Sequence, residues 1–199
     1  MDKVENNSNF KSLLKDQFSF NTVQVASMGL LIALEVVLNR FGSINMWNLK
    51  IGLAFIPVVI AGMLFGPVKA SLVGVLSDII GAILFPSGAF FPGFTLTAFL
   101  KGLLYGTLLY KNPKFLNVTL AVVIDQFILS LLLNSLWISI LYASSAAETG
   151  YWAVVASRVV QVAIIVPVEF AVCMALPKVL INRLKPMLNS IGRKKSTLA

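Results

Sequence analysis

Four cationic side chains stand within or beside long apolar stretches, where a charged group needs a specific partner. They are Arg40, Lys50, Lys101 and Arg158. A desolvated lysine or arginine binds carboxylates through charge-assisted hydrogen bonds, and ionisable groups inside a membrane face a cavity or a partner. The four cations therefore predict a site for an anionic ligand.

Two further polar residues, Asp78 and Asn134, occur at a similar depth in the apolar stretches. Counted from the outer ends of the expected helices, Lys101, Arg158 and Asp78 each lie about seven residues inside, or roughly 10 Å at 1.5 Å per residue, and Asn134 about eight. Asp78 and Asn134 can accept hydrogen bonds from an amino-substituted heterocycle. The alternative is an internal salt bridge of Asp78 with Arg158 or Lys101, which leaves one cation over.

Aromatic residues are concentrated in the outer loops and at the outer helix ends. An interfacial aromatic belt explains part of this pattern. Trp47 falls in an outer loop, Phe90 and Phe91 flank a turn rich in proline and glycine, and Trp152 flanks a helix start. Planar rings at such places can stack on a flat ligand, and Phe91, Trp152 and Trp47 join the candidate site.

The elements that carry these residues are predicted to be membrane-spanning helices. The chain has 199 residues, of which 58% are hydrophobic and 12% charged, more apolar than a soluble domain requires. Proline, glycine and charge divide it into apolar segments, several of which approach or exceed the roughly 20 residues that cross a bilayer. The expected helices cover about 23–41, 51–65, 68–85, 94–110, 116–142 and 151–181, with a loop at 42–50.

This pattern predicts an all-α, six-helix transmembrane domain over 23–181, an N-terminal arm over 1–22 and a basic tail over 182–199. With the N-terminus inside, every lysine and arginine other than the four named above falls on the cytoplasmic side, in agreement with the positive-inside rule. Both termini are therefore expected in the cytoplasm and the chain in the cell membrane. The net charge of +8 reflects this topology and anionic lipid, so no nucleic-acid partner is expected.

Catalysis and metal binding are not expected. The chain has no histidine, which is the commonest metal ligand and acid/base group. It also lacks the G-x-x-x-x-G-K-[ST] loop of a nucleotide site. The deeper carboxylates Glu35, Asp125 and Glu169 can pair with Lys178 or Lys69 near the inner surface, pack inside the bundle or conduct protons. Packing or interface roles are favoured, because no histidine or dense chain of carboxylates supports a proton relay, and the individual roles stay open.

The segment Phe85–Gly106, FPSGAFFPGFTLTAFLKGLLYG, resembles the folate-specific S components of energy-coupling factor (ECF) vitamin transporters. The resemblance runs over 29–168 and includes Leu38–Phe41 and Ser157–Gln161, so that Gln161 joins the candidate ligand residues. It implies a six-helix membrane subunit that holds a folate-class vitamin near the outer face. It also implies a transmembrane coupling protein and two cytoplasmic ATPases, which use ATP, whereas this chain needs no cofactor.

The resemblance also implies a docking surface on the first helix. Family members dock through small residues, usually as A-x-x-x-A, and the best match here is Gly29-x-x-x-Ala33 with Ala26 on roughly the same face. Small-xxx-small spacing lets helix backbones approach closely. The alternative is that these residues pack inside the subunit. For the function, an S component for riboflavin or thiamin and a self-sufficient carrier remain as alternatives.

Overall fold

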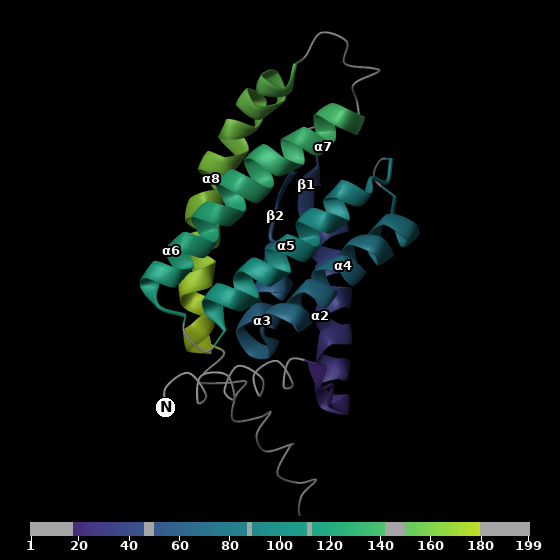
Figure 1. Cartoon of the computed structure of the whole chain (residues 1–199), viewed down its shortest axis with the longest axis vertical. Coiled ribbons are helices and arrows are strands. Elements are labelled where there is room, and N and C mark those ends of the chain that lie inside the picture. Colours follow the sequence, from purple (N-terminus) through teal and green to yellow (C-terminus); the bar gives the residue numbers. More distant parts are fainter. Residues whose placement is uncertain (1–17, 46–49, 87–88, 111–112, 142–149, 180–199) are drawn as a thin grey trace, which may run out of the picture.

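The computed structural model describes residues 18–45, 50–86, 89–110, 113–141 and 150–179, which form a helical bundle (Figure 1). Helix α6, the π-helical segment η1 and helix α7 follow one another without a break and form one continuous helical stretch. The helices are α2 (Thr22–Arg40), α3 (Phe55–Phe65), α4 (Pro67–Leu84), α5 (Pro92–Leu109), α6 (Phe115–Val123), η1 (Ile124–Leu133), α7 (Asn134–Leu141) and α8 (Tyr151–Val179). The strands are β1 (Ser43–Asn45) and β2 (Lys50–Gly52).

Proline and glycine set the helix boundaries as the sequence predicts. Gly66 ends α3 with φ of 86°, a left-handed conformation that a side chain would disfavour. Pro67 and Pro92 stand at the first turns of α4 and α5, where a missing N–H costs nothing. The described residues thus contain six helical stretches if α6, η1 and α7 count as one, at nearly the expected positions.

The segment after α2 differs from the prediction. β1 and β2 pair antiparallel with Ser43 opposite Gly52, where a loop was expected. A Cβ at position 52 would lie 2.1 Å from Ser43 Oγ, so only glycine fits this pairing. The predicted start of the second helix at Ile51 is therefore wrong, since the extended pairing carries the chain to Gly52 before α3 begins at Phe55.

Helices α4 and α5 form the most extensive contact in the bundle. A Cβ at Gly102 would lie 2.5 Å from the Ala70 carbonyl group, and one at Gly106 would lie 2.2 Å from the Pro67 Cα atom. Because these glycines carry no side chain, the two backbones come into direct contact. This seam fixes α5, the helix that carries Lys101, relative to α4, which carries Asp78.

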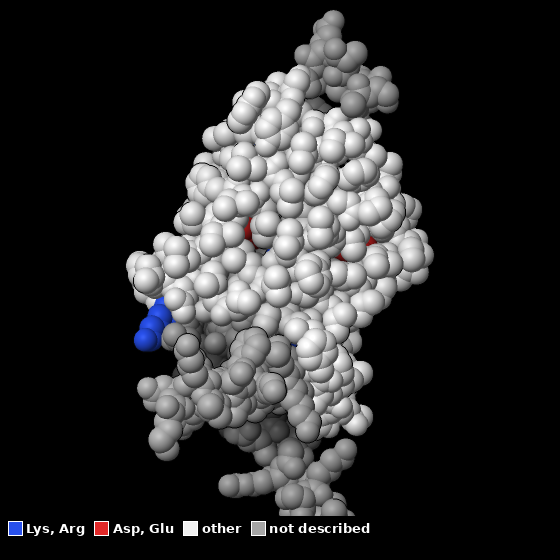
Figure 2. Space-filling model, viewed as in Figure 1, with Lys and Arg blue, Asp and Glu red and all other residues white. Residues whose placement is uncertain are grey.

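The outer surface is that of a membrane protein. Four helical stretches, 22–40, 67–84, 115–141 and 151–178, are long and apolar enough to cross a bilayer, and α3 is a shorter apolar helix. Figure 2 shows a face on which uncharged side chains cover almost all of the described surface. Exposed leucine, isoleucine, valine and phenylalanine side chains occur on every long helix, as expected of helices in contact with lipid.

Candidate ligand-binding site

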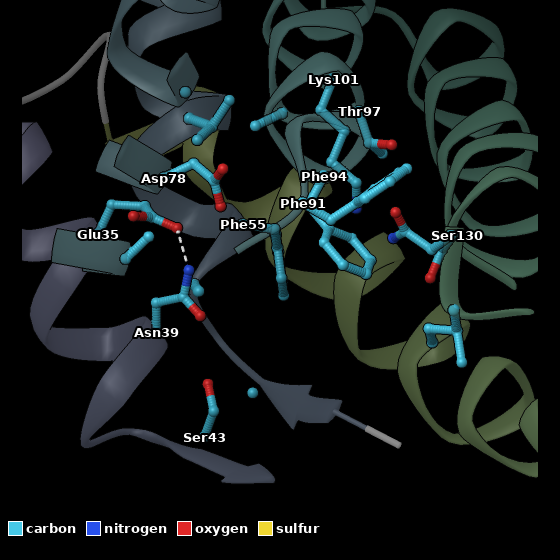
Figure 3. A pocket seen from close by; sticks show the side chains of 18 of the residues that line it. Glu35, Asn39, Ser43, Phe55, Asp78, Phe91, Phe94, Thr97, Lys101 and Ser130 are labelled. Carbon is cyan, nitrogen blue, oxygen red and sulfur yellow. Dashed lines mark hydrogen bonds between the residues drawn. The ribbon is translucent and has the colours of Figure 1, made fainter. Parts of the chain in front are cut away.

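A cavity of about 390 Å³ lies between the helices, within the size range of small-molecule sites. Its walls come from α2, α3, α4, α5, η1, α7 and α8, from the β1–β2 pair and from the segment between α4 and α5 (Figure 3). Tyr105 and Ile165 lie at its inner end, within the bundle, and Pro86, Phe90 and Leu141 lie at the opposite end, the mouth of the cavity, where α4 and α7 end.

The structure brings most of the predicted ligand residues to this one cavity. Trp152 is not among them, because it projects from the first turn of α8 with 73% of its surface exposed. Trp47 and the side chain of Lys50 lie outside the described residues. The candidates that line the cavity are Arg40, Asp78, Phe91, Lys101, Asn134, Arg158 and Gln161.

Arg158 has the environment of an anion-binding residue. It is 5% exposed, lines the cavity, and forms no ion pair among the described residues. Its Nε atom has no hydrogen-bond partner there, and neither has Oδ1 of Asn134, which lines the same cavity. A buried guanidinium without a counter-charge is costly. A bound anion would supply the missing partner.

Asp78 is on the opposite wall and is not part of a salt bridge. Its Oδ2 atom accepts a hydrogen bond of 2.6 Å from the Thr95 hydroxyl group. Lys101 pairs instead with Asp125, whose Oδ1 atom is 3.0 Å from the Lys101 Nζ atom. The alternative of a structural pair between Asp78 and Arg158 or Lys101 is therefore wrong. The other carboxylate oxygen of Asp78, Oδ1, can accept a hydrogen bond from a donor in the cavity.

An aromatic wall closes the cavity on the side of α5 and α7. The Phe91 ring lies 5.6 Å from the ring of Trp137 and 6.2 Å from that of Phe94. Trp137 donates a 3.0 Å hydrogen bond from Nε1 to the Thr97 hydroxyl oxygen, which fixes the indole. A Cβ at Gly93 would lie 2.5 Å from both the Phe91 and the Trp137 rings, so a glycine is needed here.

Sequence reasoning missed several residues of the cavity wall. Glu35 is 8% exposed and accepts a 2.8 Å hydrogen bond from Nδ2 of Asn39, one turn along α2. The spacing of Glu35, Asn39 and Arg40 in an apolar helix was a signal for one polar face. Further polar and aromatic lining residues that were not predicted are Ser43, Phe55, Phe94, Thr97, Tyr105, Gln126 and Ser130.

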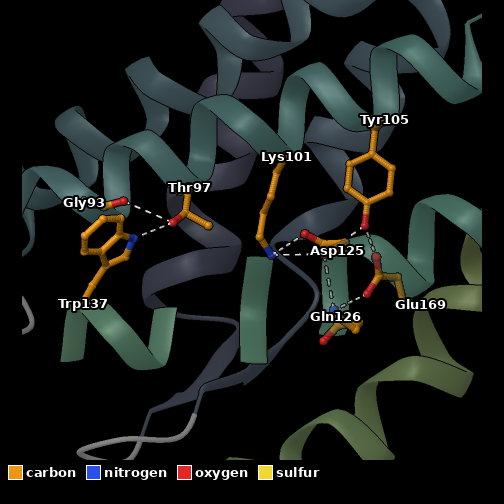
Figure 4. A network of polar contacts seen from close by, with 8 residues as sticks. All are labelled: Gly93, Thr97, Lys101, Tyr105, Asp125, Gln126, Trp137 and Glu169. Atoms are coloured by element: carbon orange, nitrogen blue, oxygen red, sulfur yellow. Dashed lines mark hydrogen bonds and ion pairs between the residues drawn. The ribbon is translucent and has the colours of Figure 1, made fainter. Parts of the chain in front are cut away.

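The predicted pairing of the two deep carboxylates with Lys69 or Lys178 is wrong, although both carboxylates do pack inside the bundle. Neither pairs with Lys69 or Lys178; Asp125 pairs with Lys101, and Glu169 is hydrogen-bonded to Tyr105 and Gln126 (Figure 4). The reason is that both side chains face the interior of the bundle and are 0% exposed. Separately, the Lys69 ammonium group donates a 2.9 Å hydrogen bond to Gln24 Oε1 on α2.

Comparison with known proteins identifies the family. The model of the substrate-specific component of ECF transporters matches residues 23–177. The chain belongs to this family. It is thus a transporter component, which confirms that it is a membrane protein and not an enzyme.

Individual relatives in the family carry a more specific name. The folate transporter FolT of Clostridium novyi is 41% identical over 143 residues, which is 71% of this chain and 80% of the relative. The folate transporter FolT of Leuconostoc mesenteroides subsp. mesenteroides is 29% identical over 76% of this chain and 83% of its own. A crystal structure of FolT bound with folic acid superposes with a TM-score of 0.71 and 36% identity, covering 78% of this chain and 93% of that one.

Proposed function

We propose that this chain binds folate at the extracellular face of the cell membrane and delivers it inward with a coupling protein and two ATPases. Two relatives named folate transporter, one of them 41% identical, support the choice of vitamin. The similar fold of FolT bound with folic acid supports it further. The single observation that carries the proposal is the buried Arg158 guanidinium, which lines the cavity without an ion-pair partner among the described residues.

The cavity suits the chemistry of folate, which joins a flat amino-substituted pterin ring to a glutamate with two carboxylates. Arg158 and Asn134 offer a charged donor and an amide to a carboxylate. Asp78, on the opposite wall, accepts hydrogen bonds from the amino-substituted ring, and Phe91 provides a surface for stacking. Arg40, Lys101 and Gln161 line the same space and complete the proposed set, in which Lys101 acts while paired with Asp125.

The membrane topology belongs to the same proposal. Six transmembrane segments over 23–181, with the arm 1–22 and the tail 182–199 in the cytoplasm, place the cavity mouth outside. One observation supports this, together with a general rule. Lys69 and Lys114 stand at the end of the bundle opposite the mouth formed by Pro86 and Leu141, and an excess of basic residues marks the cytoplasmic side.

Helix α2 provides the proposed docking surface for the coupling protein. Ala26, Gly29 and Ala33 are all exposed, and a Cβ at Gly29 would meet no atom within 4 Å. This exposure does not favour the alternative in which the three residues pack inside the subunit. The stretch 22–40 is also the least buried of the four long apolar stretches, with 22% of its residues inside the molecule. A partner helix can therefore approach this face closely.

Reconstitution separates the proposed mechanism from its alternatives. Proteoliposomes that contain this chain, the coupling protein and both ATPases should accumulate labelled folate only when ATP is present. This chain requires no cofactor of its own, so ATP is consumed by the partners alone. Folate accumulation by the chain alone would identify a self-sufficient carrier instead, and ATP-dependent uptake of riboflavin or thiamin without folate would change the substrate.

A further inference from the structure

Beneath the inner end of the cavity, two carboxylates share one cation. Asp125 on η1 and Glu169 on α8 are both 0% exposed. Lys101 on α5 lies 3.0 Å from Asp125 Oδ1 and 3.1 Å from Asp125 Oδ2, and no cation among the described residues forms an ion pair with Glu169. With both carboxylates ionised, the cluster would carry a buried net charge of one negative unit, which is costly in a low-dielectric interior.

The hydrogen bonds of the cluster also indicate that one of the two carboxyl groups carries a proton. The Tyr105 hydroxyl oxygen lies 3.0 Å from Asp125 Oδ2 and also forms a hydrogen bond with Glu169 Oε1 (Figure 4). A hydroxyl group has one proton and can donate to only one of these oxygens. The second contact is a hydrogen bond only if a carboxyl group donates to Tyr105.

The surroundings of the two carboxylates show which one holds the extra proton. Asp125 is surrounded by donors: Lys101, Tyr105, and Gln126 Nε2 at 3.4 Å. Glu169 has only Tyr105 and the Gln126 amide group. Asp125 is therefore the ionised member, and Glu169 donates to Tyr105, which donates in turn to Asp125.

We propose that this cluster is a buried proton-binding site in which Glu169 holds the proton, and that this proton sets the charge of the cavity floor. Lys101, Tyr105 and Gln126 line the cavity, whereas the two carboxylates lie behind that lining. With the proton bound, the cluster is neutral. Without it, one negative charge is added next to the site of an anionic ligand.

Among the described side chains, few titratable groups face Glu169. They are Lys101 and Tyr105 on α5, Asp125 on η1, and the buried thiol of Cys173 on α8 itself. The other helices that pack on α8, namely α3, α6 and α7, contain no titratable residue. Strand β2 also packs on α8 and contains Lys50, whose side chain lies outside the described residues. Since anion binding is stronger with the proton in place, the affinity for a ligand with carboxylates should fall as the pH rises and Glu169 loses its proton.

Infrared spectroscopy of the purified chain tests the proton directly and needs no ligand. The wild-type protein should show the carbonyl band of a buried carboxylic acid at neutral pH. Labelling the glutamate carboxyl groups with ¹³C should shift this band, and Glu169→Gln should remove it. Asp78→Asn and Glu35→Gln should leave it in place. A band that persists in Glu169→Gln, or that is lost in Glu35→Gln, would overturn the proposal.

Folate titrations at neutral and alkaline pH test the effect on the cavity, and this part rests on the proposed function. Wild-type affinity should fall on the order of tenfold over the range in which the band disappears, as expected for one added charge nearby. Glu169→Gln should bind with an affinity that does not change over this range. Unchanged wild-type affinity would refute the control of cavity charge. A chain that shows the band but binds no folate would refute the proposed substrate and leave the proton site intact.

Discussion

Helices α5 and α2 carry the same small-residue spacing, but on α5 it faces the inside of the bundle and on α2 it faces the surface. On α5, Gly102 and Gly106 press against the backbone of α4, and a Cβ at either position would lie within 2.5 Å of it. On α2, Gly29 and Ala33 are exposed, and a Cβ at Gly29 would meet nothing within 4 Å. The glycine pair on α5 therefore packs two helices of the same chain together, whereas the pair on α2 is accessible to a partner protein.

This contrast shows that spacing alone does not assign a role to small residues. A glycine or alanine every four residues says that a helix can be approached closely on that face. Whether the neighbour belongs to the same chain is decided by the burial of that face. The two pairs can be separated by experiment because one controls folding and the other should control assembly.

The largest effect is expected for Gly106→Leu. The new side chain would begin 2.2 Å from the Pro67 Cα atom, so α4 and α5 must separate. Overpacking of this kind costs about 3 kcal/mol or more. The yield of monodisperse protein in detergent should collapse, while the matched variant Gly29→Leu should behave like the wild type. Normal yield and thermal stability of Gly106→Leu would show that the α4–α5 seam is looser than described.

Replacing both Gly29 and Ala33 with leucine should abolish ATP-dependent uptake without changing the fold. The bulky side chains would hold a partner helix away from α2, whereas the cavity lies on the other side of that helix. Folate affinity and thermal stability should stay near wild-type values, and copurification with the coupling protein should be lost. Thr107→Leu, at an exposed position on α5, is the control.

Two other results for the double variant would contradict the assignment of α2. Unimpaired uptake would place the docking surface elsewhere. Loss of folate binding together with loss of stability would mean that these residues pack inside the subunit, as in the α4–α5 seam.

Arg158→Gln and Asp78→Asn should weaken folate binding while leaving both the seam and the docking surface intact. Loss of one charge-assisted hydrogen bond should cost roughly 1.5–3 kcal/mol, or about ten- to a hundredfold in affinity. Calorimetry measures the affinity, and thermal unfolding checks the fold. Lys178→Gln, on the exposed last turn of α8, is the control. Full affinity in both well-folded variants would remove these residues from the site.

The smallest effect is expected for Thr97→Val. Valine keeps the shape but removes the acceptor of the Trp137 indole N–H, so the Phe91 ring is held less firmly. Loss of this hydrogen bond should cost ~1 kcal/mol, or about fivefold in affinity. Thr107→Val, an exposed threonine on the same helix, should have no effect. Equal affinities of the two variants would show that the aromatic wall does not contribute to binding.

The sequence predicted the helices well because their boundaries depend on local chemistry. Gly66, Pro67 and Pro92 end or begin helices through their own backbone properties, wherever the rest of the chain lies. The β1–β2 pairing was missed because its register is set by contacts between two short strands, and a run of three residues has too little periodicity to show it.

The sequence predicted how deep along its helix each site residue lies, but only partly toward which neighbour its side chain points. Counting residues from the helix ends brought Asp78, Asn134 and Arg158 to one layer, and all three line the cavity. The partner of Lys101 was not predictable, because depth along a helix does not say toward which neighbour Asp125 projects, and the π-helical winding of η1 departs from the α-helical period that such a prediction assumes. Trp152 fails for a related reason, since depth does not say on which side of α8 a ring points.

Calorimetric titration of the purified chain with folate tests the central claim most directly. No nucleotide and no partner protein should be needed, because the cavity is formed by this chain alone. The account predicts saturable binding of folate at one site, with riboflavin and thiamin giving no heat of binding. Tight binding of another vitamin with no binding of folate would contradict it.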